Sequence, residues 1–226
     1  MSVSEIIYGE FKEEMKNRFL CNVNIKGTDT VCYIPSSCRL SNFINLTGRK
    51  VMLQPIKKKH ARTKYSVYAV KYRQNYVPLN LSNVNRIIET NFSRRIFSFL
   101  GKRKNVYREK LVDDYKSDLY IADTDTVIEI KSILSFNSDA LFPTIFSERA
   151  NLQLKRIKLL LENGHKVYYI FVSMYSGTKC VSINKEQVEY AKLFNECVRK
   201  GMGVCAFSLG MKNDEIFVKS RVKIKY

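Results

Sequence analysis

Hydrophobic and polar residues alternate along the first third of the chain, and this alternation predicts β-strands. In RFLCNVNIKGTDTVCYI (18–34), alternating residues flank the turn sequence Gly27-Thr28-Asp29, which indicates a hairpin. RKVMLQPI (49–56) and TKYSVYAVKY (63–72) continue the β pattern to about residue 80, whereas the segment before residue 18 is expected to be helical or frayed. Several short strands joined by basic loops favour a small β-barrel of the OB type.

The pattern changes near Leu81, where helical spacing replaces alternation. Residues 82–100 begin with Ser and Asn, which suit a helix cap, and the spacing of their apolar residues predicts one helix. Its expected buried face is Val84, Ile88, Phe92, Ile96 and Phe99. Strands are expected next at 104–111, 117–122 and 126–133.

Helices and strands alternate over the rest of the chain. SERANLQLKRIKLLLENG (147–164) starts at a capping Ser and stops at Gly, so it predicts a helix. KVYYIFVSMY (166–175) is typical of a buried strand; a helix over 185–201 and the strand VCAFSL (204–209) follow. The order predicts an α/β fold with a mixed sheet flanked by helices, and two domains, 1–80 and 81–226.

A strong positive charge runs through the chain. Its 39 Lys and Arg residues against 21 Asp and Glu give a formal net charge of +18. Such a field attracts polyanions, most simply nucleic acid, although the accumulation of lysine codons in an AT-rich genome would also produce it. DNA is the expected partner, and a homodimer is also compatible with the sequence.

The predicted barrel carries much of this charge, because Asp29 is the only acidic residue between Arg18 and Asn80. Barrels of this type hold nucleic-acid backbones in basic grooves, although a generic β-domain with solvated lysines fits the pattern equally well. The candidate nucleic-acid contacts here are Arg39, Lys57, Lys58 and Lys59. Arg39 could instead brace the barrel, and the three lysines could form a solvated loop.

Cysteine usage and hydropathy point to a reduced, cytoplasmic protein. The six cysteines form no CxxC pair and the chain has two histidines, so a zinc site is poorly supported. We expect these cysteines to be small core residues. No apolar N-terminal run resembles a signal peptide, and the longest apolar stretch, 167–175, is too short to span a bilayer.

The stretch DLYIADTDTVIEIKS (118–132) places acids and a lysine among strand formers. Alternation puts Glu129 and Lys131 on one face, and a turn at 123–126 sets Asp118 on the neighbouring strand. Two adjacent carboxylates favour a bound cation, and Mg²⁺ or Mn²⁺ would complete its shell with water and phosphate oxygens. A lysine there can hold the phosphate or help to deprotonate the attacking water. The alternative is a common Glu-x-Lys pair on a half-exposed strand with no chemical role.

The order of these elements resembles the PD-(D/E)XK nuclease core, in which an acid and a Glu-x-Lys motif line a metal site beside a helix. Asp118, Glu129 and Lys131 match that motif, and Glu89 on the preceding helix matches the extra acid that some members use as a metal ligand. Arg149 and Gln153 lie four residues apart on the next helix and could reach the phosphate. The alternative is that they form an ordinary solvated helix start, and this alternative is stronger for Gln153 than for Arg149.

Across its whole length the chain resembles the SfsA family, the sugar fermentation stimulation proteins. The matching stretches are Arg18 to Leu20, Pro35 to Arg39, TKYSVYAV (63–70), Asn85-Arg86, Asp118, EIKS (129–132), LFP (141–143) and SER (147–149). The resemblance implies an OB-like domain followed by a PD-(D/E)XK-like domain. It also implies DNA binding with little sequence preference, a metal-dependent nuclease activity and a regulatory role in sugar metabolism.

Some positions depart from the family pattern. Residues 35–39 keep only the proline and arginine of the usual Pro-Asn-Thr-Gly-Arg, and Thr144 and Ala150 replace an aspartate and a glycine. These departures concern the loop of the N-terminal domain and the periphery of the site, whereas Asp118, Glu129 and Lys131 are intact.

The sequence leaves three functions open. The first is a Mg²⁺-dependent nuclease, the second a DNA-binding regulator with a vestigial pocket, and the third an RNA-binding or RNA-processing protein.

Overall fold

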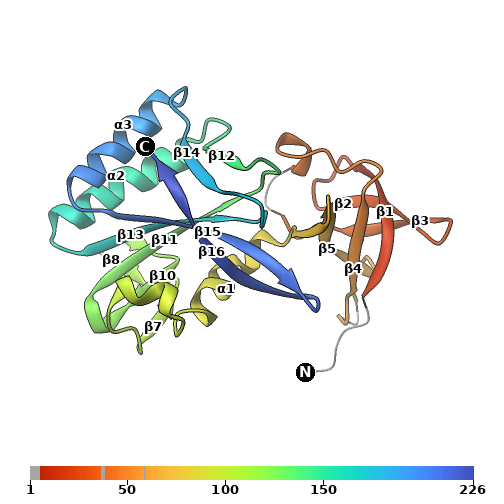
Figure 1. The fold of residues 1–226 in the computed structure, drawn as a ribbon, viewed down its shortest axis with the longest axis horizontal. Helices are drawn as coiled ribbons and strands as arrows, with labels where there is room; N and C mark the ends of the chain where they lie inside the picture. The colour runs from red at the N-terminus through yellow and green to blue at the C-terminus, as the bar shows by residue number, and fades with distance from the viewer. Residues whose placement is uncertain (1–5, 37–38, 59) are drawn as a thin grey trace.

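The N-terminal part of the computed structural model is a β-barrel (Figure 1). The structure describes residues 6–36, 39–58 and 60–226. Over these ranges the first sheet has six strands in the order β3-β2-β1-β4-β5-β6, and a β3–β5 pairing at Tyr33 and Ser66 closes the first five into the barrel. The strands are β1 (Ile7–Glu14), β2 (Leu20–Ile25), β3 (Thr28–Tyr33), β4 (Lys50–Pro55), β5 (Tyr65–Tyr72) and β6 (Asn75–Pro78), and a short 3-10 helix η1 (Leu40–Asn42) follows β3. The predicted hairpin and OB-like barrel are confirmed.

Strand β1 corrects the prediction of a helical or frayed start. It pairs with both β2 and β4, and its Phe11 is buried. Gly9 permits this close packing, because a Cβ there would lie 2.5 Å from the Val23 side chain. Glu and Lys occupy most of the other positions of β1, so its inward-facing residues are too few to show alternation.

The C-terminal part is an eight-stranded mixed sheet in the described residues, with the order β12-β14-β16-β15-β13-β11-β10-β7. Helices α2 (Glu148–Glu162) and α3 (Val188–Arg199) cover one face, and α1 (Val84–Thr90) lies on the other, toward the barrel (Figure 1). The strands are β7 (Val106–Arg108), β10 (Leu119–Ile121), β11 (Thr126–Ile133), β12 (Asp139–Phe142), β13 (Lys166–Ser173), β14 (Cys180–Ile183), β15 (Gly203–Lys212) and β16 (Glu215–Lys225). A small separate hairpin joins β8 (Leu111–Val112) to β9 (Tyr115–Lys116).

The single helix predicted over 82–100 is wrong. The segment consists of η2 (Leu81–Asn83), α1, a break, and the 3-10 helix η3 (Arg95–Leu100), with Arg94 in an extended conformation at the break. Phe92 and Phe97 both enter the core and meet in a T-shaped arrangement, with ring centroids 5.4 Å apart. In a continuous helix residues five apart point about 140° away from each other, so the break is what brings both rings into one core.

The other predicted elements differ mainly at their ends. Helix α2 begins as expected, because the Ser147 hydroxyl accepts a hydrogen bond from the Ala150 N–H. The strand expected at 104–111 shortens to β7, and β12 and β14 were not predicted. Each of these two strands has only four residues, too few for a clear periodicity.

The barrel and the large sheet share one hydrophobic core. At their junction Tyr72 of β5 stacks on Phe136 with ring centroids 4.1 Å apart, and the Tyr68 hydroxyl donates to the Asp214 carbonyl at the tip of the β15–β16 hairpin. The boundary predicted after residue 80 falls between β6 and η2.

The cysteines of the described residues are reduced and buried, as expected: Cys21, Cys32, Cys180, Cys197 and Cys205. Cys38 lies outside the described residues, as does Ser37 of the 35–39 motif. No helix in the described ranges is long and apolar enough to cross a membrane.

Candidate metal and phosphate site

Two carboxylates meet where the β10–β11 hairpin opens. The hairpin is antiparallel with Leu119 opposite Ile128, and its turn includes Asp123 and Asp125, as predicted. Asp118 precedes β10, and its Oδ2 accepts a hydrogen bond from the Ile130 N–H at 2.7 Å. This carboxylate therefore replaces the missing strand partner of β11 and is fixed in place by the backbone itself.

Glu129 and Lys131 point to the opposite side of β11 from Ile128 and Ile130, toward α2. Glu129 is 2% exposed, and a buried carboxylate requires partners. The Lys131 Nζ lies 2.5 Å from its Oε1, Gln153 donates to the same oxygen at 3.1 Å, and the Tyr115 hydroxyl donates to Oε2. The Lys131 Nζ also donates to the Gln153 side-chain oxygen at 2.6 Å, so the three side chains form a closed network.

The two acids repel each other, and this affects the pKa of Asp118. Burial, and then the charge of Glu129, raise the pKa of Asp118 to about 6, although the bonds from Ile130 and Asn85 and the charge of Lys131 oppose this. Both carboxylates line one cavity. A divalent cation would relieve the repulsion between them.

The donor set fits a hard cation. The described ranges hold no cluster of three or more His, Cys, Asp or Glu side chains arranged for a metal. Two carboxylates are nevertheless what Mg²⁺ commonly takes from a protein, with water and substrate phosphate filling the remaining positions. A closed zinc site needs more protein ligands than this pair supplies.

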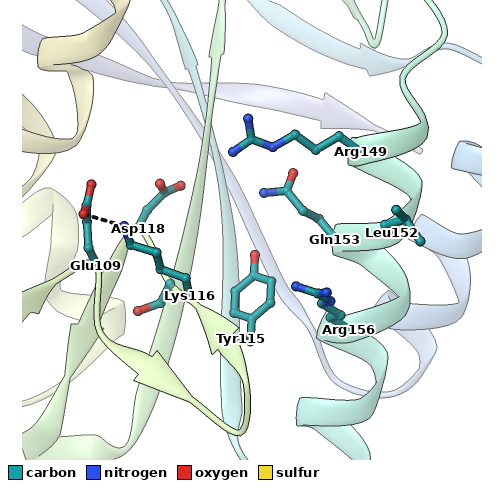
Figure 2. A pocket seen from close by; sticks show the side chains of 9 residues that line it. Glu109, Tyr115, Lys116, Asp118, Arg149, Leu152, Gln153 and Arg156 are labelled. Carbon is teal, nitrogen blue, oxygen red and sulfur yellow. Dashed lines mark ion pairs between the residues drawn. The ribbon is translucent and has the colours of Figure 1, made fainter.

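Helix α2 faces the acids with a cationic ridge, which we define as Arg149, Gln153 and Arg156. Figure 2 shows these three side chains extending from α2 toward the segment before β10 that carries Asp118, with Tyr115 between them. They line a cavity of about 310 Å³ together with Asp118 and Lys116. Arg149 is solvent-exposed, so its guanidinium can receive a phosphate.

Glu89 does not join the acidic pair, which corrects the prediction of a third acidic ligand. It forms an ion pair with Arg108 on β7 and lines a different cavity. The helix still serves the site, through Asn85 one turn earlier, whose amide donates to Asp118 Oδ1 at 3.0 Å. The reason is that Arg108 attracts the glutamate toward β7, and only the first turn of α1 reaches Asp118.

Three of the nucleic-acid contacts predicted in the barrel, Arg39, Lys57 and Lys58, do not line the cavities at Asp118 and Glu129. The Arg39 guanidinium donates to the carbonyls of Met15 and Lys16, which favours the bracing role. Lys57 and Lys58 are exposed but do not line either cavity at Asp118. Lys59 lies outside the described residues.

Sequence reasoning gave no role at the site to three contributors: Asn85, which it noted only as part of a family match, Tyr115 and Arg156. The place of Arg156 could have been predicted, since it lies seven residues after Arg149 and therefore on the same helix face. The contacts of Asn85 with Asp118 and of Tyr115 with Glu129 could not be predicted, because each joins residues that are brought together only by tertiary packing.

An acid–histidine–acid bridge holds the β8–β9 hairpin, and with it Tyr115. His165 Nδ1 lies 2.9 Å from Asp125, and its Nε2 lies 3.0 Å from Asp113 in the hairpin. Burial lowers the pKa of His165, but the bonds to Asp125 and Asp113 outweigh this and raise it overall. Only the imidazolium can donate from both nitrogens at once.

We expect His165→Gln to destabilise the protein more in mild acid than in mild alkali. A histidine whose pKa is raised by folding stabilises the protein below the unfolded value of 6.5, and this contribution is lost as pH rises through the folded value. Urea unfolding of both proteins at about pH 6 and about pH 9 measures the difference. Equal losses at both pH values would show that the bridge does not depend on the proton.

Known families account for almost the whole chain. The model of the sugar fermentation stimulation protein RE domain matches residues 82–215, and that of the SfsA N-terminal OB domain matches residues 14–79. The chain belongs to the sugar fermentation stimulation protein family. The RE domain contains both carboxylates, Lys131 and the cationic ridge.

Relatives in this family are similar over their full length. A homolog from Caldanaerobacter subterraneus subsp. tengcongensis is 25% identical over 223 residues, which cover 97% of this chain and 96% of the homolog. One from Natranaerobius thermophilus is 25% identical over 214 residues, 91% of this chain and 88% of the homolog. The structure of Pyrococcus furiosus SfsA in complex with Ca²⁺ shares the fold with a TM-score of 0.84 at 20% identity, covering 100% of this chain and 98% of that one.

Proposed function

We propose that this protein is a metal-dependent nuclease that hydrolyses phosphodiester bonds of DNA with low sequence specificity. One observation carries the proposal. Asp118 and Glu129 line a single cavity with Lys131 between them and the cationic ridge. A carboxylate pair beside a lysine and arginines is suited to a cation on one side of a phosphate and positive charge on the other.

Each side chain has a distinct role in this proposal. Asp118 and Glu129 hold Mg²⁺ or Mn²⁺, and the bound ion would polarise the phosphate and lower the pKa of its water. Lys131, already hydrogen-bonded to Glu129 and Gln153, orients that water or a phosphate oxygen. Arg149 and Arg156 bind the phosphate on the side of α2.

The binding surface extends beyond the site. A net charge of +18 attracts a polyanion, and OB domains commonly track single strands with basic grooves. Within the family, the Pyrococcus furiosus protein is described with Ca²⁺, which like Mg²⁺ takes oxygen ligands. We assign residues 1–80 to nucleic-acid binding and residues 81–226 to hydrolysis.

A second candidate is a DNA-binding regulator that does not cleave. The bonds of Tyr115, Lys131 and Gln153 favour it, because they satisfy both oxygens of Glu129 with no metal required. In this case the pocket is structural, and the basic surface alone carries the function. An RNA-binding role has no separate support in the geometry.

A cleavage panel separates the candidates. The pure protein is incubated with single- and double-stranded DNA and RNA, in Mg²⁺, in Mn²⁺ and in chelator. A nuclease cleaves DNA only when metal is present. Salt-sensitive binding without cleavage in either metal would support the regulator and contradict the proposed activity.

We expect Arg156→Ala to weaken DNA binding and flatten its salt dependence. Loss of one phosphate contact reduces the slope of log K against log salt by about 0.7 for a single strand and about 0.9 for a duplex. Binding titrations at several salt concentrations measure the slope. Arg199, exposed on α3 and outside both cavities, is the matched control. Equal slopes for the two variants would remove Arg156 from the phosphate path.

A further inference from the structure

The cavity that is lined by Lys131 and the two acids also has an apolar part, which we call the chamber. This pocket has a volume of about 420 Å³. The chamber walls come from β11, from the end of β12 and the segment that joins it to α2, and from the barrel, which contributes Phe43. The apolar lining includes Phe43, Leu141, Phe142, Pro143 and Ile145.

Phe43 and Phe142 also pack against the hydrophobic cores, but two aliphatic groups of the chamber wall are open to solvent. Leu141 and Ile145 are each 49% exposed, and Phe43 is half-buried. Large exposed aliphatic groups that gather beside a charged site mark a place where a ligand is desolvated. The polar groups among them are the hydroxyls of Ser132, Thr144 and Ser147.

The same cavity therefore has a charged part, lined by Asp118, Glu129 and Lys131, and an apolar part, the chamber. Arg149 and Gln153 line both the smaller cavity and this one, so the phosphate position lies at the junction. A ligand that spans it carries a phosphate at one end and a flat, largely apolar group with hydrogen-bonding edges at the other. A nucleotide has this composition.

We infer that the chamber receives the base of an unpaired nucleotide next to the bound phosphate, so that the substrate is single-stranded DNA. This deepens the proposed function, on which the phosphate position rests. In a duplex the base is stacked and paired and must lose both interactions to enter a side pocket, whereas the base of a single strand loses least. Phe43 supplies an aromatic surface of the kind on which bases stack. The barrel thereby completes the pocket of the other domain.

Binding to an abasic strand tests this directly. End-labelled oligonucleotides of one length are titrated in chelator: an intact single strand, the same strand with abasic positions, and the blunt duplex. Intact and abasic strands carry the same backbone charge, so their affinity ratio reports the bases alone. Stacking on one aromatic side chain changes affinity by about 5- to 150-fold, so we expect a ratio of at least about five for the parent protein.

Two neighbouring residues give a matched pair of variants. Ile145→Ala alters the chamber, whereas Phe146→Ala alters a side chain that is 66% exposed and lines a different cavity. Ile145→Ala should lower the intact-to-abasic ratio by about threefold, and Phe43→Ala by about fivefold or more. Phe146→Ala should leave it unchanged. Ile145 lies outside the buried core, so its variant keeps the test valid if Phe43→Ala fails to fold.

The inference is overturned if the parent binds intact and abasic strands equally, if it prefers the duplex, or if Ile145→Ala and Phe146→Ala give the same ratio. Tighter binding of a matched RNA strand would overturn the assignment to DNA. Because chelator prevents metal-dependent cleavage, the result is independent of hydrolysis. If the protein never cleaves but binds intact strands more tightly than abasic strands, only the proposed nuclease function is contradicted. If it cleaves but binds both strands equally, only this inference is contradicted.

Discussion

Replacing Asp118 with asparagine is expected to reduce metal-dependent DNA cleavage by about 10²–10³-fold or more. The amide keeps an oxygen for the Ile130 N–H, and rotation of the Asn85 amide restores the second hydrogen bond, so the local geometry survives. What is lost is the negative charge that, with Glu129, would hold the cation. Cleavage rates at saturating metal, and calorimetric titration with Mn²⁺, measure the two consequences.

Asp114→Asn is the matched control for this substitution. Asp114 lies in the turn of the β8–β9 hairpin at a positive φ of 61°, a conformation that asparagine also tolerates, and it lines neither cavity at Asp118. It should cleave and bind metal like the parent protein. If Asp118→Asn and Asp114→Asn were equally active, the metal site would lie elsewhere.

The same Asp118→Asn variant is expected to be more stable than the parent at neutral pH. Burial and Glu129 raise the pKa of Asp118 from 3.8 to about 6. The folded state therefore holds a proton that the unfolded chain releases, and the stability of the parent falls as pH rises from about 4 to about 6. The free energy of unfolding lost at pH 7 is about 2–3 kcal/mol, which the neutral amide does not lose.

Urea unfolding of both proteins across this pH range, in chelator, measures the effect. The gain of Asp118→Asn over the parent should be largest at about pH 7 and should disappear below about pH 4. A gain that does not vary with pH would mean that the carboxylate is not strained by its neighbours. Loss of activity together with gain of stability is typical of residues held for function.

The alternation of one strand predicted the centre of the site. Because side chains alternate, the pattern of residues 126–133 placed Glu129 and Lys131 on one face, and the structure has them hydrogen-bonded there. Asp118 was predictable for a similar reason, since a turn at 123–125 fixes the register of its hairpin.

The surroundings of the site depended on tertiary packing that no local pattern records. Glu89 lies on the helix where the nuclease core can carry an extra acid, but it forms an ion pair with Arg108 on β7 instead. Tyr115 falls between the strands predicted at 104–111 and 117–122, and its hydroxyl reaches Glu129 because a separate hairpin, β8–β9, carries it there. The break at Arg94 was hidden because both halves of the segment carry apolar residues at helical spacing.

Single-turnover cleavage of single-stranded DNA by the parent protein and Lys131→Met, side by side in Mg²⁺, tests the central claim most directly. Methionine keeps the apolar stem of Lys131 and removes only the ammonium that contacts Glu129 and Gln153. The predicted result is cleavage by the parent, none in chelator, and a rate about 10²–10⁴-fold lower for the folded variant. Equal rates for the two proteins, or no metal-dependent cleavage by the parent, would contradict it.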